Sequence, residues 1–594
     1  MNNYTLENFL DIKTAGGGSF NKDDNKIAYL SDVTGTSQVF IKDLVKDTVE
    51  QITDYPDGIR FASYIPHHDQ ILFGKDIGGN EQTQFYIYDE STKQTKKITS
   101  DDASIYRPGG ISKDGKKIAY SSNQRNGKDF DVYVLDLDTL KETCVYQDHG
   151  WCDSSGFSPD GKKLVILDRA SLTANSLVLV DIETKKSKIL NKDQTTKHSQ
   201  ARWLPDNSGF FFISNENSDF LAVDFYHLGS AETHRKLAFN WDVSELSVSK
   251  DGKSLAITVN ENGYETIKLY DVLTFTQIDC KGFPQGMASG LSWSSDSSML
   301  LFSYGDSTQT KAVWLWEKST DRSRQISPDF QPIESSKLVN PELITFTSHD
   351  GMDIPSFLYL PKDTDGRENL PVIIFIHGGP ESQYTPSFNP LVQYFLYKGY
   401  AVAAPNVRGS SGYGKHYLTL DDKEKRLDSV QDIVYLKKYL ETRPEINSQK
   451  VILMGGSYGG YMVLANMAFY PEHWLAGIDI VGIANFVSFL ENTSEWRREL
   501  REVEYGSLTT DKEMLERISP INKVENIQAP LFIIHGANDP RVPLSEAEQI
   551  DTKLKELGRD VELHVYQDEG HGLAKLKNKV DAYSKVLAFL ERYV

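Results

Sequence analysis

A serine set between glycines suggests nucleophilic chemistry in the second half of the chain. Residues 450–460 read KVILMGGSYGG, so an apolar run leads into a G-x-S-x-G motif centred on Ser457. This motif is typical of a tight turn between a strand and a helix, where glycines leave room for the backbone and the serine hydroxyl is exposed. The amino end of the helix would also favour the negative charge that develops when a hydroxyl attacks a carbonyl. We therefore predict that Ser457 is a nucleophile.

Such a serine needs a base, and the base needs a carboxylate that orients it. In α/β sheets with this serine motif, an acid and then a histidine follow the serine along the chain. Asp539 stands just beyond the apolar run 531–536, and His571 follows the run 562–566. We therefore predict that Asp539 and His571 are the carboxylate and the base. Other candidates are better explained as structural residues or lie too close to His571 in sequence: His473, His535, His564, Asp568 and Glu569.

Two backbone N–H groups should bind the negative oxygen that forms when a serine attacks a carbonyl. Tyr458 follows the nucleophile and would supply one of them. The sequence HGGP at 377–380 comes directly after the apolar run 372–376, and its glycines permit a close approach of the backbone. We expect the second N–H to come from Gly379, with Gly378 as the alternative.

These candidate residues stand at the ends of short apolar segments in the second half of the chain. The segments alternate with stretches of helical periodicity such as 424–441, and another such stretch, 578–593, closes the chain. The apolar segments are 372–376, 400–405, 450–455, 476–481, 531–536 and 562–566. This alternation predicts a parallel sheet flanked by helices.

The first half of the chain consists of a repeat. Segments such as 111–122 and 157–168 align, and their anchor aspartates recur every 45 or 46 residues. The anchors are Asp24, Asp69, Asp114, Asp160, Asp206, Asp251 and Asp296. Each unit holds hairpin turns and alternating apolar strands, and about 45 residues suit one four-stranded propeller blade. Seven units predict a seven-bladed β-propeller; a two-sheet sandwich is the alternative, but sandwiches do not keep this period.

The composition excludes several classes of protein. The 594 residues are 39% hydrophobic and 25% charged, which is typical of a folded globular chain. The net charge of −20 disfavours nucleic-acid binding, and three cysteines (Cys144, Cys152 and Cys280) fit a reducing compartment. The first residues lack the basic start and apolar core of a signal peptide, and no apolar run approaches the ~20 residues of a membrane helix. We therefore expect a cytoplasmic protein without membrane contact.

Together the motifs resemble the prolyl oligopeptidase superfamily and are most similar to its acylaminoacyl peptidase branch. The resemblance rests on GGSYGGY at 455–461, HGGP at 377–380, APNVRGSSGYG at 404–414, HGANDPRVP at 535–543 and DEGHG at 568–572. It covers essentially the whole chain and implies an N-terminal seven-bladed β-propeller (all-β) joined to a C-terminal α/β-hydrolase fold. It also implies the triad Ser457, Asp539 and His571, with no metal or organic cofactor.

The resemblance implies substrate-binding residues as well. Arg541, two positions after Asp539, matches an arginine that anchors the substrate, and a guanidinium there can hold a peptide carbonyl with two donors. Phe486, Trp496 and Leu500 are candidates for an apolar specificity pocket, with core packing as an equal interpretation.

The chain also departs from parts of the family. Tyr458 stands where prolyl oligopeptidase itself has Asn, which disfavours strict proline specificity. Dipeptidyl peptidases bind a free amino terminus with a pair of propeller glutamates. The propeller half of this chain contains no Glu-Glu pair, which weakens that interpretation without excluding acids from separate blades.

We divide the chain into an arm at 1–18, a propeller at 19–325 and a hydrolase domain at 326–594. Leu6 and Phe9 in the arm predict a short amphipathic helix that packs on the hydrolase domain of its own subunit or of a partner in a homodimer. The expected function is a serine oligopeptidase that releases N-acylated amino acids from short blocked peptides, with the propeller as a size filter. The alternatives are a carboxylesterase and a dipeptidyl or tripeptidyl peptidase with the same triad.

Overall fold

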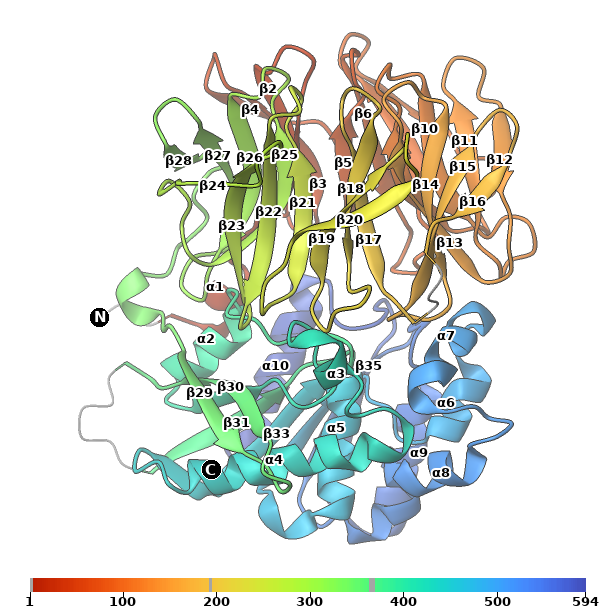
Figure 1. Ribbon diagram of the computed structural model, residues 1–594. Helices are drawn as coiled ribbons and strands as arrows, with labels where there is room; N and C mark the ends of the chain where they lie inside the picture. Colours follow the sequence, from red (N-terminus) through yellow and green to blue (C-terminus); the bar gives the residue numbers. More distant parts are fainter. Residues whose placement is uncertain (1–3, 192–194, 363–368) are drawn as a thin grey trace.

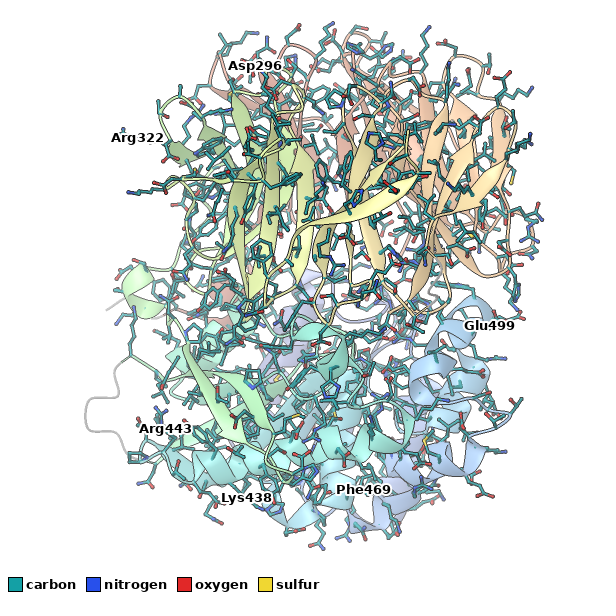
Figure 2. The ribbon with its side chains drawn as sticks, viewed as in Figure 1. Asp296, Arg322, Lys438, Arg443, Phe469 and Glu499 are labelled. Carbon is teal, nitrogen blue, oxygen red and sulfur yellow. The ribbon has the colours of Figure 1, made fainter. Side chains whose placement is uncertain are left out.

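The computed structural model describes residues 4–191, 195–362 and 369–594. Figure 1 shows a strand-rich body stacked on a second body, in which helices surround a sheet. Asp296, an anchor of the sequence repeat, lies at the end of the strand-rich body that is remote from the second one (Figure 2). Among the described residues, no helix is long and apolar enough to span a membrane.

The strand-rich body is built from sheets whose strands follow one another in the chain. Five sheets have four strands each, and β21 to β28 form an eight-stranded sheet in which Glu265 and Met287 make the one parallel pair between β23 and β25. The four-stranded sheets contain β1 (Ala15–Phe20), β2 (Lys26–Ser31), β3 (Gln38–Asp43) and β4 (Thr48–Gln51); β5 (Ile59–Tyr64), β6 (Gln70–Lys75), β7 (Gln84–Asp89) and β8 (Gln94–Lys97); β9 (Tyr106–Ile111), β10 (Lys117–Ser122), β11 (Asp131–Asp136) and β12 (Glu142–Tyr146); β13 (Trp151–Phe157), β14 (Lys163–Arg169), β15 (Asn175–Asp181) and β16 (Ser187–Ile189); β17 (His198–Trp203), β18 (Gly209–Ser214), β19 (Ala222–His227) and β20 (Glu232–Leu237). The eight-stranded sheet contains β21 (Val243–Val248), β22 (Ser254–Glu261), β23 (Tyr264–Asp271), β24 (Gln277–Ile278), β25 (Met287–Trp293), β26 (Met299–Gly305), β27 (Ala312–Glu317) and β28 (Arg322–Gln325).

This arrangement is a propeller of four-stranded units, as the repeat predicts. That the propeller has seven blades stays a prediction. The eight-stranded sheet would supply two of these blades if it is divided between β23 and β25. The sequence signals mark the second and third strands of a unit, such as β2 and β3, because these strands are largely buried. The first strand β1 reads AGGGSF and the exposed fourth strand β4 reads TVEQ, so neither carries apolar alternation.

The first strand of the propeller lies against the last sheet. The Ala15 N–H donates to the Lys311 carbonyl at 2.8 Å, and the Gly17 N–H donates to the Ser303 hydroxyl at 2.9 Å. The propeller therefore begins inside the predicted arm 1–18. The glycines serve close packing there, since a Cβ on Gly18 would lie 2.5 Å from a methyl carbon of Leu301. Contacts between sheets, rather than a shared strand, close the ring at this position.

The second body contains the predicted parallel sheet, extended by two antiparallel strands at one edge. Its order is β29-β30-β32-β31-β33-β34-β35-β36, and all neighbours from β32 onward are parallel. The strands are β29 (Glu342–Thr347), β30 (Asp353–Tyr359), β31 (Leu370–Ile376), β32 (Ala401–Pro405), β33 (Ile446–Gly456), β34 (Ala476–Ile480), β35 (Leu531–Gly536) and β36 (Val561–Tyr566). The carboxyl ends of the parallel strands consequently lie along one edge of this sheet.

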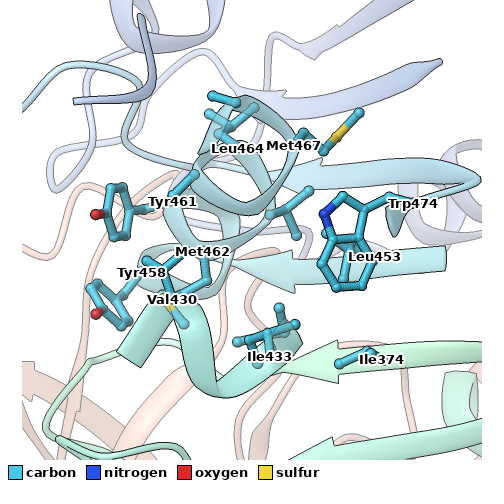
Figure 3. Packing of buried hydrophobic residues seen from close by; sticks show 14 of the residues in the cluster. Ile374, Val430, Ile433, Leu453, Tyr458, Tyr461, Met462, Leu464, Met467 and Trp474 are labelled. Carbon is cyan, nitrogen blue, oxygen red and sulfur yellow. The ribbon is translucent and has the colours of Figure 1, made fainter. Parts of the chain in front are cut away.

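Helices cover both faces of this sheet. Alternate residues of β31 serve opposite faces, since Ile374 and Ile373 belong to different apolar clusters. Figure 3 shows α5 packed on β33 and on α4, with Met462 of α5 beside Val430. The helices are α1 (Leu6–Leu10), α2 (Pro390–Tyr397), α3 (Gly414–Leu418), α4 (Arg426–Leu440), α5 (Tyr458–Phe469), α6 (Phe486–Asn492), α7 (Glu495–Tyr505), α8 (Lys512–Ile518), α9 (Ser545–Glu556) and α10 (Leu576–Leu590).

The N-terminal helix α1 docks on the α/β domain of its own chain. Thr5 caps the helix by accepting a hydrogen bond from the Asn8 N–H at 3.3 Å. Phe9 is completely buried, and its ring centre lies 5.3 Å from that of Tyr394 and 5.6 Å from that of Tyr397, both on α2. A helix of five residues is unstable alone, so these contacts hold it in place.

The variant Phe9→Ala tests this docking. Replacing a core phenylalanine by alanine costs roughly 3–5 kcal/mol, so we expect the free energy of unfolding to fall by about 3 kcal/mol or more. Urea denaturation followed by tryptophan fluorescence would measure the change. Glu7→Ala is the matched control, because Glu7 is exposed on the same helix. Equal midpoints for the two variants would show that α1 contributes nothing to stability.

Candidate active site

Ser457 occupies the sharp turn between β33 and α5. Its backbone has φ +59° and ψ −119°, a strained conformation for a residue with a side chain. The neighbouring glycines are required, since a Cβ on Gly455 would lie 2.3 Å from the Gly459 carbonyl oxygen, and one on Gly459 would lie 2.2 Å from that of Ile376. The predicted strand, turn and helix are therefore present, and the turn presents the hydroxyl at the first turn of α5.

The structure brings Ser457, His571 and Asp539 together. The His571 Nε2 atom lies 3.0 Å from the Ser457 hydroxyl oxygen, and its Nδ1 atom lies 2.6 Å from Asp539 Oδ2. The buried Asp539 carboxylate also accepts hydrogen bonds from the N–H groups of Arg541 at 2.8 Å and Val542 at 3.0 Å. These two bonds fix the carboxylate, which in turn orients the imidazole towards the serine.

The competing residues have other partners. His535 is completely buried, its Nε2 lies 3.0 Å from the Val542 carbonyl, and burial lowers its pKa. His564 stacks on Phe532 with ring centres 4.6 Å apart. The remaining acids also have local partners: Asp568 accepts from Lys575 at 2.9 Å, and Glu569 accepts from the backbone N–H groups of Ala574 and Lys575.

The HGGP loop lies against the nucleophile turn. A Cβ on Gly378 would be 2.9 Å from the Gly456 carbonyl oxygen and 3.3 Å from Ser457 Cβ. The next residue, Gly379, has φ +128°, a conformation that favours glycine. Tyr458 is the first residue of α5, where N–H groups have no partner within the helix. The choice between Gly379 and Gly378 as second donor stays a prediction.

A propeller loop completes the rim of this site. Arg541 donates from Nε to Glu81 at 2.8 Å, and Arg497 of α7 also pairs with Glu81. Glu81 lies between β6 and β7, and in the same loop a Cβ on Gly79 would be 3.8 Å from the Gly570 nitrogen, next to His571. Sequence reasoning missed Glu81, because a single acid in a propeller loop belongs to no motif.

The predicted pocket residues lie in two different environments. Phe486 is completely buried at the start of α6, with ring centres 4.8 Å from Tyr461 and 5.0 Å from Tyr505. Trp496 instead lies at the interface with the propeller, 5.4 Å from the ring centres of both Phe130 and Trp151. Leu500 lines an interdomain cavity of about 240 Å³ together with Trp496. Phe486 therefore lies in the core of the domain and Trp496 packs between the domains, and a role of either in a specificity pocket stays a prediction.

A larger interdomain cavity adjoins the candidate site. Its volume is about 370 Å³, and it lies between the propeller and the start of α7. Glu81, Arg497 and Pro540 line it, and Pro540 follows Asp539 directly. The cavity thus lies beside the charged rim and next to the residue that follows Asp539. Glu499 of α7 lies at the level of the same interface in Figure 2.

Comparisons with known proteins identify both domains. The sequence pattern of the prolyl oligopeptidase family matches residues 386–594, and that of the TolB beta propeller domain matches residues 109–331. The chain is 25% identical to dipeptidyl aminopeptidase BIII of Pseudoxanthomonas mexicana, over 94% of this chain and 83% of that protein. It is 24% identical to the acylamino-acid-releasing enzyme of Mus musculus, over 41% of this chain and 34% of that enzyme.

The fold is shared with solved structures over the whole chain. A puromycin hydrolase superimposes with a TM-score of 0.88 at 15% identity, covering 100% of this chain and 96% of that one. This similarity supports the pairing of a propeller with an α/β-hydrolase domain. The two patterns thus identify residues 386–594 as a prolyl oligopeptidase family domain that follows a TolB-type propeller, and the chain is a serine peptidase.

Proposed function

We propose that Ser457, His571 and Asp539 are the catalytic triad and that the enzyme cleaves short peptides through an acyl-enzyme. The observation that carries this proposal is the continuous chain of contacts from the Ser457 hydroxyl through His571 to the buried Asp539. His571 accepts the serine proton as the oxygen attacks the scissile carbonyl, and it then donates that proton to the leaving amine. The N–H groups of Tyr458 and Gly379 bind the oxyanion. Water then attacks the acyl-enzyme, with His571 again acting as the base, and this step releases the product.

The charge at the rim supports one class of substrate. Arg541 and Arg497 share one carboxylate, Glu81, so this group of three is net positive. A net positive anchor suits the carbonyl oxygens of an N-acyl group and disfavours a free ammonium group. We therefore propose that the enzyme releases N-acylated amino acids from short blocked peptides, with the propeller limiting substrate size.

A dipeptidyl peptidase activity is the second candidate. It is favoured by the name of the bacterial relative that covers 94% of this chain, and by the presence of a propeller carboxylate, Glu81, at the rim. In this alternative a substrate ammonium group would displace one arginine from Glu81. A carboxylesterase activity would use the same triad on an ester.

A matched pair of substrates separates these candidates. N-acetylalanine p-nitroanilide and glycylalanine p-nitroanilide differ only by an ammonium group on the acetyl methyl. We expect kcat/KM to be about 10-fold or more higher for the acetyl compound, because an unpaired ammonium beside a net positive anchor is costly. The reverse order, abolished by Glu81→Gln, would establish the dipeptidyl candidate instead. Cleavage of N-acetylalanine methyl ester alone would establish the esterase.

Arg541→Met tests the anchor itself. A hydrogen bond to a charged group contributes about 1.5–3 kcal/mol, so we expect kcat/KM for the preferred anilide to fall by roughly 10- to 100-fold. The loss should appear mainly in KM, because the arginine binds a part of the substrate that does not react. Arg517→Met is the control, since Arg517 is an exposed arginine of α8 that pairs with Glu424. An unchanged KM in Arg541→Met would remove Arg541 from the binding site.

We also keep two predictions about the protein's setting. A cytoplasmic location agrees with the reducing compartment that the cysteine count suggests. A homodimer is proposed as the oligomeric state, and sedimentation equilibrium of the full chain would test it. Since α1 docks on its own subunit, any contribution of the arm to a dimer would come from its outer face.

A further inference from the structure

Arg426, the first residue of α4, is a completely buried cation behind the candidate active site. Its guanidinium donates to the Asp421 carboxylate and, at 3.0 Å, to the carboxylate of Glu504. It also donates at 3.0 Å to the hydroxyl of Tyr458, the residue that follows the nucleophile. One buried arginine thus joins the loop before α4, helix α7 and the start of α5.

The hydroxyl of Tyr458 is held from several sides. It donates to Asp421 at 3.1 Å, and the Ser429 hydroxyl lies 3.1 Å away. The Arg426 guanidinium also lies 5.1 Å from the centre of the Tyr458 ring. Figure 3 shows this ring beside Val430 of α4 and Met462 of α5. Because the ring is fixed in these contacts, the first residue of α5 has a fixed position.

The same arginine reaches the HGGP loop through a second tyrosine. Its guanidinium lies 4.9 Å from the centre of the Tyr505 ring. The Tyr505 hydroxyl donates to the Gly379 carbonyl at 3.3 Å, and Arg501 donates to the same carbonyl at 3.3 Å. The two residues proposed as oxyanion donors, Tyr458 and Gly379, are therefore both connected to Arg426.

A gain in stability alone does not explain why an arginine and two carboxylates are buried together here. Taking an arginine and its carboxylates out of water costs about as much as their attraction returns, so apolar residues of similar volume often stabilise as well. Arg408 gives the comparison within this domain. It is also buried and pairs with Asp432 and Asp350, and within the described part of the chain its guanidinium makes no hydrogen bond to Tyr458 or Gly379.

We propose that Arg426 is a positioning residue for the oxyanion hole, which it sets by fixing Tyr458 directly and Gly379 through Tyr505. This inference rests on the proposed triad and oxyanion donors. Arg426 does not touch the substrate. Its effect is to keep two N–H groups at the spacing that the oxyanion needs, because such donors act through pre-organised geometry.

The variant Arg426→Met removes the charge and keeps most of the volume. Complete loss of one oxyanion donor lowers kcat by about 100- to 1000-fold, and we expect misalignment of two donors to cost about 10- to 100-fold. KM should change less than kcat, since the donors act mainly in the transition state. Active-site titration with a fluorophosphonate gives the concentration of folded enzyme, so that partial unfolding does not enter the measured kcat.

Inhibitor affinity provides a readout that a merely structural role would not move. A peptidyl trifluoromethyl ketone forms a tetrahedral adduct with an oxyanion, whereas the released N-acetyl amino acid does not. We expect Arg426→Met to lower the affinity for the ketone by the same factor as it lowers kcat/KM. The affinity for the product should stay within about twofold of that of the unaltered enzyme. Parallel weakening of both compounds, or of neither, would overturn the proposal.

Two further variants keep the test decisive. Tyr458→Phe removes one hydroxyl from the network and keeps the ring, and it should weaken ketone binding in the same direction as Arg426→Met. Arg408→Met is the matched control, which should lower stability but should not change the affinity for the ketone relative to the affinity for the product.

Burial raises the pKa values of Asp421 and Glu504, so both acids can become neutral when Arg426 is lost and the variant can fold. If the unaltered enzyme fails to react with the fluorophosphonate, the proposed triad fails first, independently of Arg426.

Discussion

Replacing Ser457 by alanine is expected to lower kcat by about 10⁶-fold on the best substrate, because loss of a triad serine removes the covalent pathway altogether. The residual rate would come from substrate binding and the oxyanion donors. Hydrolysis of the preferred p-nitroanilide and labelling by a fluorophosphonate would both measure the loss. Turnover within about tenfold of the unaltered enzyme would exclude Ser457 as the nucleophile.

The fold should survive this change. The Ser457 hydroxyl has one hydrogen-bond partner among the described residues, His571, so its removal leaves no buried group other than the imidazole without a partner. We expect the melting temperature to change by no more than a few degrees. Ser584→Ala is a suitable control, because Ser584 is exposed on α10 and the same hydroxyl is removed. Full activity in Ser584→Ala and none in Ser457→Ala would locate the chemistry.

Asp539→Asn is expected to lower kcat by about 10⁴-fold with little change in structure. The carboxylate oxygen 2.6 Å from His571 Nδ1 fixes the tautomer in which Nε2 accepts the serine proton. An amide at this position favours the opposite tautomer and cannot stabilise the imidazolium that forms during the reaction. The kinetics of p-nitroanilide hydrolysis under substrate saturation would measure the effect on kcat.

Asp568 supplies a direct control for this second variant. It is three residues from His571 in sequence, but its carboxylate pairs with Lys575 at 2.9 Å. Asp568→Asn should therefore retain kcat within about threefold, as expected for a surface ion pair. If Asp568→Asn were the inactive variant and Asp539→Asn the active one, the assignment of the orienting acid would be reversed.

The candidate triad could be located from the sequence because local rules determine it. Ser457, Asp539 and His571 each follow a strand that an apolar run marks, and parallel strands bring their carboxyl ends to one edge. The propeller could be predicted for a similar reason, since a repeated hairpin unit leaves a regular period. In the first unit, β1 and β4 carried no signal, because β1 is rich in glycine and β4 is exposed.

Residues that depend on contact between distant segments could not be predicted. Trp496 has the apolar character of a pocket residue, but the position of α7 against the propeller decides that it packs on Phe130 and Trp151. Glu81 comes from a propeller loop, and nothing near it in sequence indicates that Arg541 is its partner. Arg426 resembles an ordinary surface residue at a helix start, and only its complete burial reveals the network.

The way in which the propeller ring closes has an evolutionary consequence. Each four-stranded unit is formed by consecutive strands, and the junction between β1 and the last sheet consists of contacts such as Ala15 to Lys311. Duplication or deletion of one gene segment of a single repeat would therefore add or remove a whole unit and leave no strand without a neighbour. Insertions between units would likewise leave the strand pairing within each unit intact. The propeller can thus diverge in size and surface while the hydrolase domain, whose site residues are spread over many strands, is constrained as a whole.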